Sequence, residues 1–220
     1  KDKQGFLAAL MEKMFADRAV YNEKLVQAER EYERTKDPKL LNDISKFYNM
    51  QQAKKIQLNS AYGALSNEYF RWFNIDLAEA ITYSAQLAVR WIAQALNDYL
   101  NKALKTQGKD FIIASDTDSV YLNMELFVAK IPSTDPVKIT KILDHFCKER
   151  IEPFIAKSFY ELAEFMHAHK QCMSMARETI SEKGIWTGKK RYLLNIWDKK
   201  GVLYDKPKLK VTGLESVRSS

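Results

Sequence analysis

Residues 111–124 constrain the fold of this chain more than any other stretch. Two apolar runs rich in β-branched residues flank a polar centre that holds Asp116 and Asp118. Apolar runs separated by a short polar turn predict a β-hairpin. Because successive strand residues point to opposite faces, two aspartates one residue apart project the same way if the turn stays extended. The stretch therefore predicts two carboxylates at the edge of a sheet.

Two carboxylates on one turn suit a divalent cation. Mg²⁺ binds through a few carboxylates and completes its shell with water and substrate phosphates. The alternative interpretation is that Asp and Ser are simply favourable turn residues. This stretch by itself does not decide between the two.

Composition limits the class of protein. The chain has 220 residues, of which 46% are hydrophobic, so it can bury a core as one domain or as a compact domain with an appendage. It has no apolar run near the roughly 18 residues of a transmembrane helix and no start that resembles a signal peptide. Cys147 and Cys172 lack metal-ligand spacing, and the three histidines form no recognisable ligand set. We expect reduced cysteines, a cytoplasmic location and no membrane partner.

Positive charge is concentrated in the last 40 residues. Residues 181–220 hold ten Lys and Arg against four acids, a net of +6, while the whole chain carries +7. Aromatic residues are interleaved with this charge, among them Trp186, Tyr192, Trp197 and Tyr204. Such a segment is typical of a face that binds a polyanion, although a lysine-rich surface can also serve solubility alone.

Helical periodicity dominates the first part of the chain. Apolar residues recur at helical spacing from Phe6 to about Arg34, and Asp37 followed by Pro38 then caps and starts a second helix that we expect Gly63 to end. Two long helices joined by a short polar turn predict an antiparallel helical hairpin.

The remaining pattern mixes helices and strands. Asn74 caps a predicted helix that ends by Gly108, and Asp135 caps another that is interrupted near Pro153. The predicted strands are Cys172–Ile180, Trp186–Trp197, Val202–Tyr204 and Lys208–Val211, with a hairpin turn at residues 198–201. The sequence therefore predicts an α+β fold, a helical hairpin followed by an antiparallel β-sheet backed by helices.

Three polar motifs occur in a fixed order. Lys55, Asn59 and Tyr62 share a helix face just before Gly63. Asp116-Thr117-Asp118-Ser119 follows, and then Lys189-Lys190-Arg191-Tyr192. Together with flanking pieces such as Phe70-Arg71, Trp91-Ile92, Asn97-x-Tyr99-Leu100-Asn101, Trp186-Thr187-Gly188 and Pro207-Lys208-Leu209-Lys210, this set resembles the family B (polymerase α-like) DNA polymerases and looks most like their T-even-like bacteriophage members.

The resemblance covers essentially the whole chain and implies its organisation. Residues 1–66 are similar to the fingers, a helical hairpin, and residues 67–220 to part of the palm domain. The thumb and the N-terminal and exonuclease domains are not represented. The implied activity is that of a DNA-directed DNA polymerase, a nucleotidyltransferase that adds dNTPs to a primer 3′-hydroxyl with two Mg²⁺ ions.

The resemblance also implies roles for single residues. Arg18, Lys55, Asn59 and Tyr62 would bind the nucleotide, with Lys55 neutralising the triphosphate and assisting the leaving group. The family often has a lysine four residues after this arginine, but here the residue is Asn22, so the first helix lacks that cation.

Acidic and basic residues of the palm are implied in the same way. Asp118 would bind metal, with Asp116 beside it as a supporting carboxylate, and Glu178 would be a further acid that faces the site. These two aspartates and Lys55 form the expected catalytic set. Contacts to primer–template DNA, largely in the minor groove, would come from Gly63, Lys189, Lys190, Arg191 and Tyr192.

One motif of the family does not occur. In the family a second metal-binding aspartate stands in Asp-x-x-Ser-Leu-Tyr-Pro, and this sequence contains no such run. We therefore expect the chain alone not to polymerise DNA. The implied partners are primer–template DNA, dNTPs, the remainder of the polymerase and a sliding clamp, in a bacteriophage-infected bacterial cell.

Three other interpretations remain open at the level of sequence. The chain could be a non-catalytic, basic nucleic-acid-binding module, which would bind DNA regardless of Mg²⁺ and nucleotide. It could be a reverse-transcriptase-like palm enzyme, although the motif from Lys55 to Gly63 upstream of Asp116 argues against this. It could also be a helical protein that only binds partners.

Overall fold

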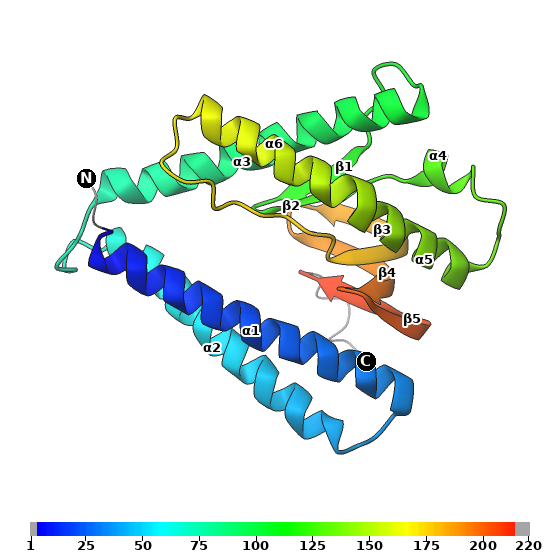
Figure 1. Ribbon diagram of the computed structural model, residues 1–220, viewed down its shortest axis with the longest axis horizontal. Coiled ribbons are helices and arrows are strands. Elements are labelled where there is room, and N and C mark those ends of the chain that lie inside the picture. The colour runs from blue at the N-terminus through cyan, green and yellow to red at the C-terminus, as the bar shows by residue number, and fades with distance from the viewer. Residues whose placement is uncertain (1–3, 214–220) are drawn as a thin grey trace. The chain divides into compact units, whose positions relative to one another are not determined.

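The computed structural model describes residues 4–213 (Figure 1). Its fold is α+β, with long helices followed by small antiparallel sheets. The helices are α1 (Phe6–Thr35), α2 (Leu40–Leu65), α3 (Ile75–Leu104), α4 (Glu125–Val128), α5 (Pro136–Phe146), the π-helical turn η1 (Cys147–Ile151) and α6 (Glu152–Phe165). The strands are β1 (Ile112–Asp116), β2 (Ser119–Leu122), β3 (Thr179–Gly188), β4 (Arg191–Lys199) and β5 (Val202–Thr212).

The chain falls into two compact units. Within the described residues, the first contains α1, α2 and the chain as far as Thr82, together with Gly201–Leu203. The second begins at Tyr83 and contains most of α3 and nearly all of the remaining elements. None of the described helices is both long and apolar enough to cross a membrane.

The predicted helical hairpin is confirmed. Helices α1 and α2 run antiparallel beside each other (Figure 1). Asp37 lies just before the second helix, and its Oδ1 accepts a hydrogen bond from the backbone N–H of Lys39 at 2.9 Å, but Lys39 and not Asp37 occupies the N-cap position. An ion pair joins the helices, with Lys54 Nζ 3.1 Å from Asp17 Oδ2.

The expected helix end at Gly63 is wrong. Helix α2 continues to Leu65. A glycine that ends a helix adopts a positive φ, and Gly63 is not among the glycines that do. The last turn closes instead through backbone bonds from Ser66 to Gly63 and from Asn67 to Ala64.

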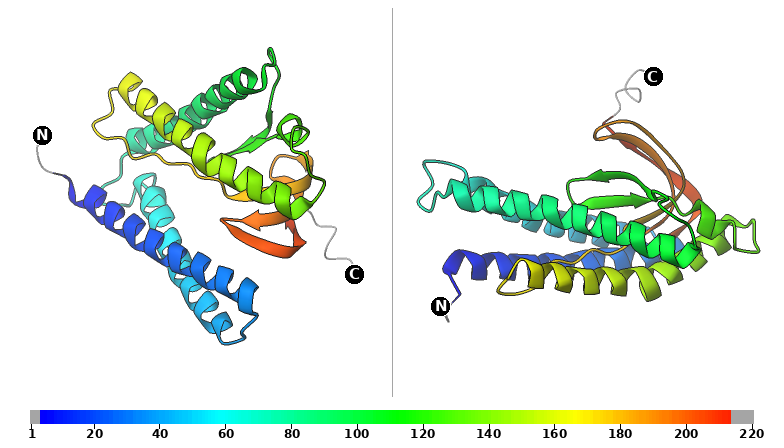
Figure 2. Two further views of the ribbon diagram at one scale, coloured as in Figure 1. Left: turned by 45° about the vertical axis from the view of Figure 1, so that its right-hand side comes forward. Right: turned by 90° about the horizontal axis from the view of Figure 1, so that it is seen from above.

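The main core of the second unit forms where α3, α6 and β1 meet. Ile92, Leu96, Leu100, Phe111 and Leu162 are at most 2% exposed. Figure 2 shows α3 and α6 side by side, and the Trp91 indole N–H bonds to the Ser158 carbonyl and hydroxyl across them, at 3.2 and 3.0 Å. Burying these apolar side chains holds the two helices together.

Two asparagines attach the end of α3 to the start of β1. Asn97 accepts from the backbone N–H of Phe111 at 2.8 Å. Asn101 donates to the carbonyls of Asn97 and Lys109 and accepts from Lys109 N–H and the Thr106 hydroxyl, at 2.8–3.0 Å. These bonds satisfy the backbone of the loop and deliver the chain to the acidic hairpin in a fixed position.

Two predicted helix signals are confirmed. Asn74 Oδ1 accepts from Leu77 N–H at 2.8 Å, and Asp135 Oδ1 accepts from Val137 N–H at 3.0 Å. The interruption near Pro153 is also present, since η1 lies between α5 and α6 and Pro153 stands in the first turn of α6. A proline is tolerated there because the first turn needs no backbone donor.

The strands differ from their predicted bounds. The single strand Trp186–Trp197 is wrong, because β3 and β4 pair antiparallel around a turn at Lys189 and Lys190. Residues 172–178 are irregular, and β5 runs unbroken where two short strands were expected. The described strands form two sheets, β1–β2 and β3–β4–β5, rather than one. Alternation predicts extended chain but does not reveal a turn made of lysines.

A buried arginine holds helices and sheet together. The Arg177 guanidinium forms ion pairs with Asp144 of α5 and Asp198 of β4. Its backbone N–H donates to Glu152 Oε1 of α6 at 2.9 Å. This residue therefore connects three elements of the second unit.

Candidate functional site

The acidic turn between β1 and β2 is tight. Asp116 pairs with Ser119, so Thr117 and Asp118 alone form the loop. Thr117 adopts a left-handed φ of 50°, and the Asp118 N–H donates to the Asp116 carbonyl at 2.6 Å. The strand alternation therefore ends at Asp116, and the condition for both carboxylates to project the same way is not met. Asp118 is exposed at the tip, whereas Asp116 is half-buried and accepts from the Thr117 hydroxyl at 2.9 Å.

Asp116 lines a hollow of about 510 Å³ in the second unit. The walls come from β1 and β2 on one side and from β3, β4 and their turn on the other, and the lining residues are Ala114, Ser115, Asp116, Tyr121, Trp186, Thr187, Gly188, Lys189, Lys190 and Tyr192. The ring of Tyr121 lies 5.4 Å from that of Trp186 and 5.7 Å from that of Tyr192. The hollow thus combines an aromatic wall, one carboxylate and two ammonium groups.

The two tyrosines of the hollow have shifted acidities. Burial raises the pKa of Tyr121 to about 12, with further contributions from the Tyr192 hydroxyl and the Asp116 carboxylate. Burial alone would also raise the pKa of Tyr192, but the Thr212 hydroxyl, Tyr121 and the Lys210 ammonium together lower it. The pKa values of both phenols therefore depend on the polar groups around the hollow.

The basic motif forms the rim of this hollow. Lys189 and Lys190 are the exposed two-residue turn between β3 and β4, and Lys190 has a left-handed φ of 60°. Arg191 begins β4 with an exposed side chain, and the next residue, Tyr192, is buried. Farther along, the Lys210 ammonium lies 5.6 Å from the centre of the Tyr192 ring. The turn projects cations beside an aromatic surface.

The predicted nucleotide-binding residues lie in the first unit. Lys55, Asn59 and Tyr62 are exposed on α2, and continuous helix places them on one face as predicted. The Tyr62 hydroxyl is 2.7 Å from the Thr82 hydroxyl, which donates to the Ala78 carbonyl at 3.1 Å. Arg18 lies half-buried on α1, and its Nε is buried without a hydrogen-bond partner. The acidic turn and the basic turn belong to the second unit, within which the hollow brings Asp116 together with Lys189 and Lys190.

Glu178 lies just before β3. Its backbone carbonyl accepts from Lys200 N–H at 2.7 Å, and its side chain is 60% exposed, 3.9 Å from the Lys200 ammonium. Three of the predicted site residues are not part of the lining of the hollow in the described structure, namely Glu178, Asp118 and Arg191.

The carboxylates present are a partial fit to Mg²⁺. Mg²⁺ is usually held by one or two carboxylates together with waters and substrate phosphates. Asp116 and Asp118 can supply such oxygens from one turn. Over residues 4–213, however, no three His, Cys, Asp or Glu side chains gather closely enough to hold a metal ion.

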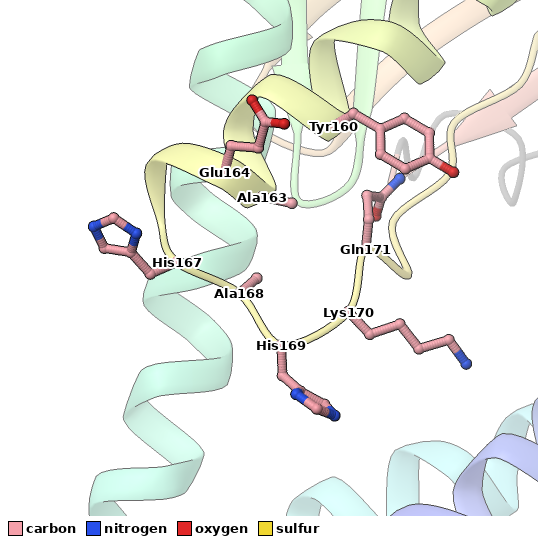
Figure 3. Close-up of a pocket in the computed structure, with 8 residues that line it drawn as sticks. All are labelled: Tyr160, Ala163, Glu164, His167, Ala168, His169, Lys170 and Gln171. Carbon is pink, nitrogen blue, oxygen red and sulfur yellow. The ribbon is translucent and has the colours of Figure 1, made fainter.

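A second hollow of about 480 Å³ lies at the end of α6. Figure 3 shows that its polar side chains, among them Glu164, His167, His169 and Lys170, point in different directions. They do not converge on one ligand position, so the aromatic and basic hollow is the better candidate site.

Sequence reasoning missed two residues of the hollow. The sequence patterns place Tyr121 in a predicted strand, and Trp186 among the aromatics of the basic segment and in Trp186-Thr187-Gly188, but they assign neither residue to a site. The register pairs Tyr121 with Ala114 and Trp186 with Tyr192. The small side chain opposite Tyr121 was the available signal for an open space beside it.

The family of the chain follows from its match to a known protein family. The chain matches DNA polymerase family B over residues 1–151 and belongs to that family. The predicted family resemblance is thus confirmed.

The particular relatives are bacteriophage polymerases. The chain is 42% identical over 178 residues to the DNA-directed DNA polymerase of Escherichia phage RB69, a match that covers 76% of this chain and 20% of the relative. It is 38% identical over 179 residues to the DNA-directed DNA polymerase of Enterobacteria phage T4, with the same coverage. The chain therefore spans about a fifth of the length of these relatives.

Proposed function

We propose that this chain is the fingers and part of the palm of a DNA-directed DNA polymerase. The observation that carries the proposal is the family match over residues 1–151, together with 42% identity to the phage RB69 polymerase. Residues 1–66 are the proposed fingers and residues 67–220 the proposed palm portion. The reaction is the transfer of a nucleotide from a dNTP to the 3′-hydroxyl of a primer.

The fingers residues bind the incoming nucleotide. The exposed face formed by Lys55, Asn59 and Tyr62 offers a cation, an amide and a phenol within two turns of one helix. Lys55 places a compact positive charge on the triphosphate and stabilises the charge that develops on the leaving pyrophosphate. Arg18, half-buried on α1, is a further proposed cation for the triphosphate.

The palm residues bind primer–template DNA. The exposed turn of Lys189 and Lys190, followed by Arg191, provides three positive charges beside the aromatic wall of the hollow. Ammonium groups at such a rim neutralise backbone phosphates and bond to base-edge acceptors that all sequences share. No atom lies within 4 Å of where a Cβ of Gly63 would be, outside the nearby helix backbone, so a base pair can approach α2 closely there.

The acidic turn supplies metal ligands. Asp118, exposed at the tip, and Asp116 would contribute carboxylate oxygens to Mg²⁺. Bound Mg²⁺ would lower the pKa of the primer hydroxyl and neutralise phosphate charge. Glu178 is a further proposed acid of this region.

We also propose that the chain alone does not extend primers. The sequence has no Asp-x-x-Ser-Leu-Tyr-Pro run, and the described residues offer no third metal ligand beside Asp116 and Asp118. The remainder of a polymerase is therefore a required partner. A sliding clamp is a further proposed partner, and a phage-infected bacterial cell is the proposed setting.

A chimaera tests this function. The matched segment of the phage RB69 polymerase is replaced by the corresponding residues of this chain, and primer extension is measured with Mg²⁺ and dNTPs. We expect the chimaera to extend primers and Asp118→Asn to lower the rate by at least about 100-fold, the usual cost of removing one electrostatic group from an active site. Asp98→Asn, the same change at an exposed site on α3, is the matched control and leaves the rate unchanged.

Two outcomes would contradict the proposal. An inactive but folded chimaera would show that the segment lacks polymerase function. If it still binds DNA, with an affinity that falls with salt and ignores Mg²⁺ and dNTPs, the basic segment acts as a non-catalytic binding module. Primer extension by the isolated 220-residue chain would refute the proposed inactivity.

A further inference from the structure

The end of β5 lies against the basic turn at a glycine. Gly213 has a left-handed φ of 64°. A Cβ atom added to it would collide with the carbonyl oxygen of Lys190 and lie 3.3 Å from the carbonyl carbon of that residue. The same atom would lie 3.0 Å from Cγ of Arg191. Only glycine allows this approach, because it has no side chain and accepts a positive φ without penalty.

The turn that Gly213 contacts is itself conformationally restrained. Lys190 has a left-handed φ of 60°, a conformation that is unfavourable for a residue with a Cβ. Such a conformation persists only where the surrounding structure holds it. On the other side of the turn, the Arg191 guanidinium folds across Gly188, within 3.3 Å of where a Cβ of that glycine would lie. The backbone of the turn is therefore enclosed between β5 and the arginine side chain.

This restraint acts on the cations of the candidate site. Lys189 and Lys190 are exposed and line the hollow that also contains Asp116 and Tyr192. A shift of the Lys190 carbonyl moves the backbone from which both ammonium groups project. The packing at Gly213 thereby sets where the two charges stand on the rim.

We propose that Gly213 is a positioning residue for DNA binding, which fixes the Lys189–Lys190 turn against β5 so that its two ammonium groups meet the nucleic-acid backbone. This inference rests on the proposed function of the turn. It adds a residue that does not itself touch DNA.

The chain provides a matched control for the test. Gly108 also has a φ of 64°, but no atom lies within 4 Å of where its Cβ would be. Gly213→Ala and Gly108→Ala therefore impose the same backbone strain, and only the first creates a collision. The affinity of the full 220-residue chain for a fluorescent primer–template duplex is measured by anisotropy at several salt concentrations.

We expect Gly213→Ala to weaken DNA binding about five-fold or more and to flatten the salt dependence by about one phosphate contact, as for the loss of one lysine contact. Gly108→Ala leaves the affinity and its salt dependence unchanged. In a chain that already carries Lys189→Gln, Lys190→Gln and Arg191→Gln, Gly213→Ala causes no further loss, because it acts through those three side chains.

The results distinguish failure of the positioning role of Gly213 from failure of the proposed DNA contact. If Lys189→Gln with Lys190→Gln does not weaken binding, the proposed DNA contact is wrong. If that pair weakens binding but Gly213→Ala matches Gly108→Ala, only the inference is overturned.

Gly213→Asn and Gly108→Asn repeat the comparison with a residue that tolerates positive φ better than alanine. Loss of binding by a folded Gly213→Asn chain supports the positioning role. If neither Gly213 variant folds while both Gly108 variants do, Gly213 serves the fold as a whole and the positioning role is refuted.

Discussion

Arg177 is the most informative residue for a stability experiment. Its side chain is 8% exposed and bridges Asp144, which is 22% exposed, and Asp198, which is 5% exposed. Arg177→Met keeps most of the aliphatic volume and removes the cation from both carboxylates.

The magnitude of the effect follows from burial. Asp198 is the more buried of the two carboxylates, 5% exposed against 22% for Asp144, so most of the cost arises at Asp198. Breaking a buried ion pair from one side costs about 3–5 kcal/mol. For a chain of this length that loss lowers the melting temperature by roughly 6–20 °C.

Urea unfolding of the wild type and of two variants measures this loss. Arg34→Met is the matched control, because Arg34 also forms two bonds to one carboxylate, that of Glu31, but on an exposed helix surface. We expect no resolvable change in the free energy of unfolding for that variant. The same measurement on Arg177→Met gives the free energy of unfolding that is lost when the buried cation is removed.

A second variant tests the electrostatic explanation. If the cost comes from a buried charge that has lost its cation, Arg177→Met with Asp198→Asn recovers part of the stability. A loss below about 1 kcal/mol for Arg177→Met, or no recovery in the double variant, would refute the reasoning.

Three further predictions concern the second unit. Asn101→Ala removes four hydrogen bonds and costs about 2–6 kcal/mol in urea unfolding, at the net value of about 0.5–1.5 kcal/mol per bond. Burial would raise the pKa of Asp144, but the Lys148 hydrogen bond and the Arg177 charge outweigh it and lower the pKa. Because the pKa of Asp144 is lower in the folded chain than the unfolded value of about 3.9, its ionised carboxylate stabilises the fold above that pH. The loss of unfolding free energy in Asp144→Asn is therefore largest at neutral pH and shrinks as pH falls below about 4. A loss that does not change with pH would contradict this explanation. Burial raises the pKa of Cys147 to about 11, so mass spectrometry of the native chain at neutral pH should show a thiol reagent on exposed Cys172 well before Cys147, and equal labelling would contradict it.

The helical part of the fold follows closely from local sequence. Helix α1 ends one residue from the predicted Arg34, and the caps at Asn74 and Asp135 act as expected. Helical periodicity and caps are signals within a few residues of one another, so one segment contains all the information needed to locate them. Gly63 was misjudged because glycine permits a helix end without requiring one.

The strands were predicted less well, because their bounds depend on partners. The turn at Lys189 and Lys190 is made by the pairing of β3 with β4 and by the approach of Gly213, which stands 23 residues later in the chain. The acidic hairpin was predicted correctly because its two strands are neighbours in sequence. The conformation of Thr117 and Asp118 within it was not, since alternation says nothing about the backbone of a two-residue loop.

The sequence by itself determined the helical hairpin, the acidic hairpin and the family. Each of these depends on residue types at fixed local spacing, which the linear order preserves. Only the tertiary structure decided that Asp116, Trp186 and the two turn lysines line one hollow, and that Arg177 joins α5, α6 and β4. Such contacts arise when distant segments pack to bury apolar surface and pair charges, and no short stretch of sequence contains that information.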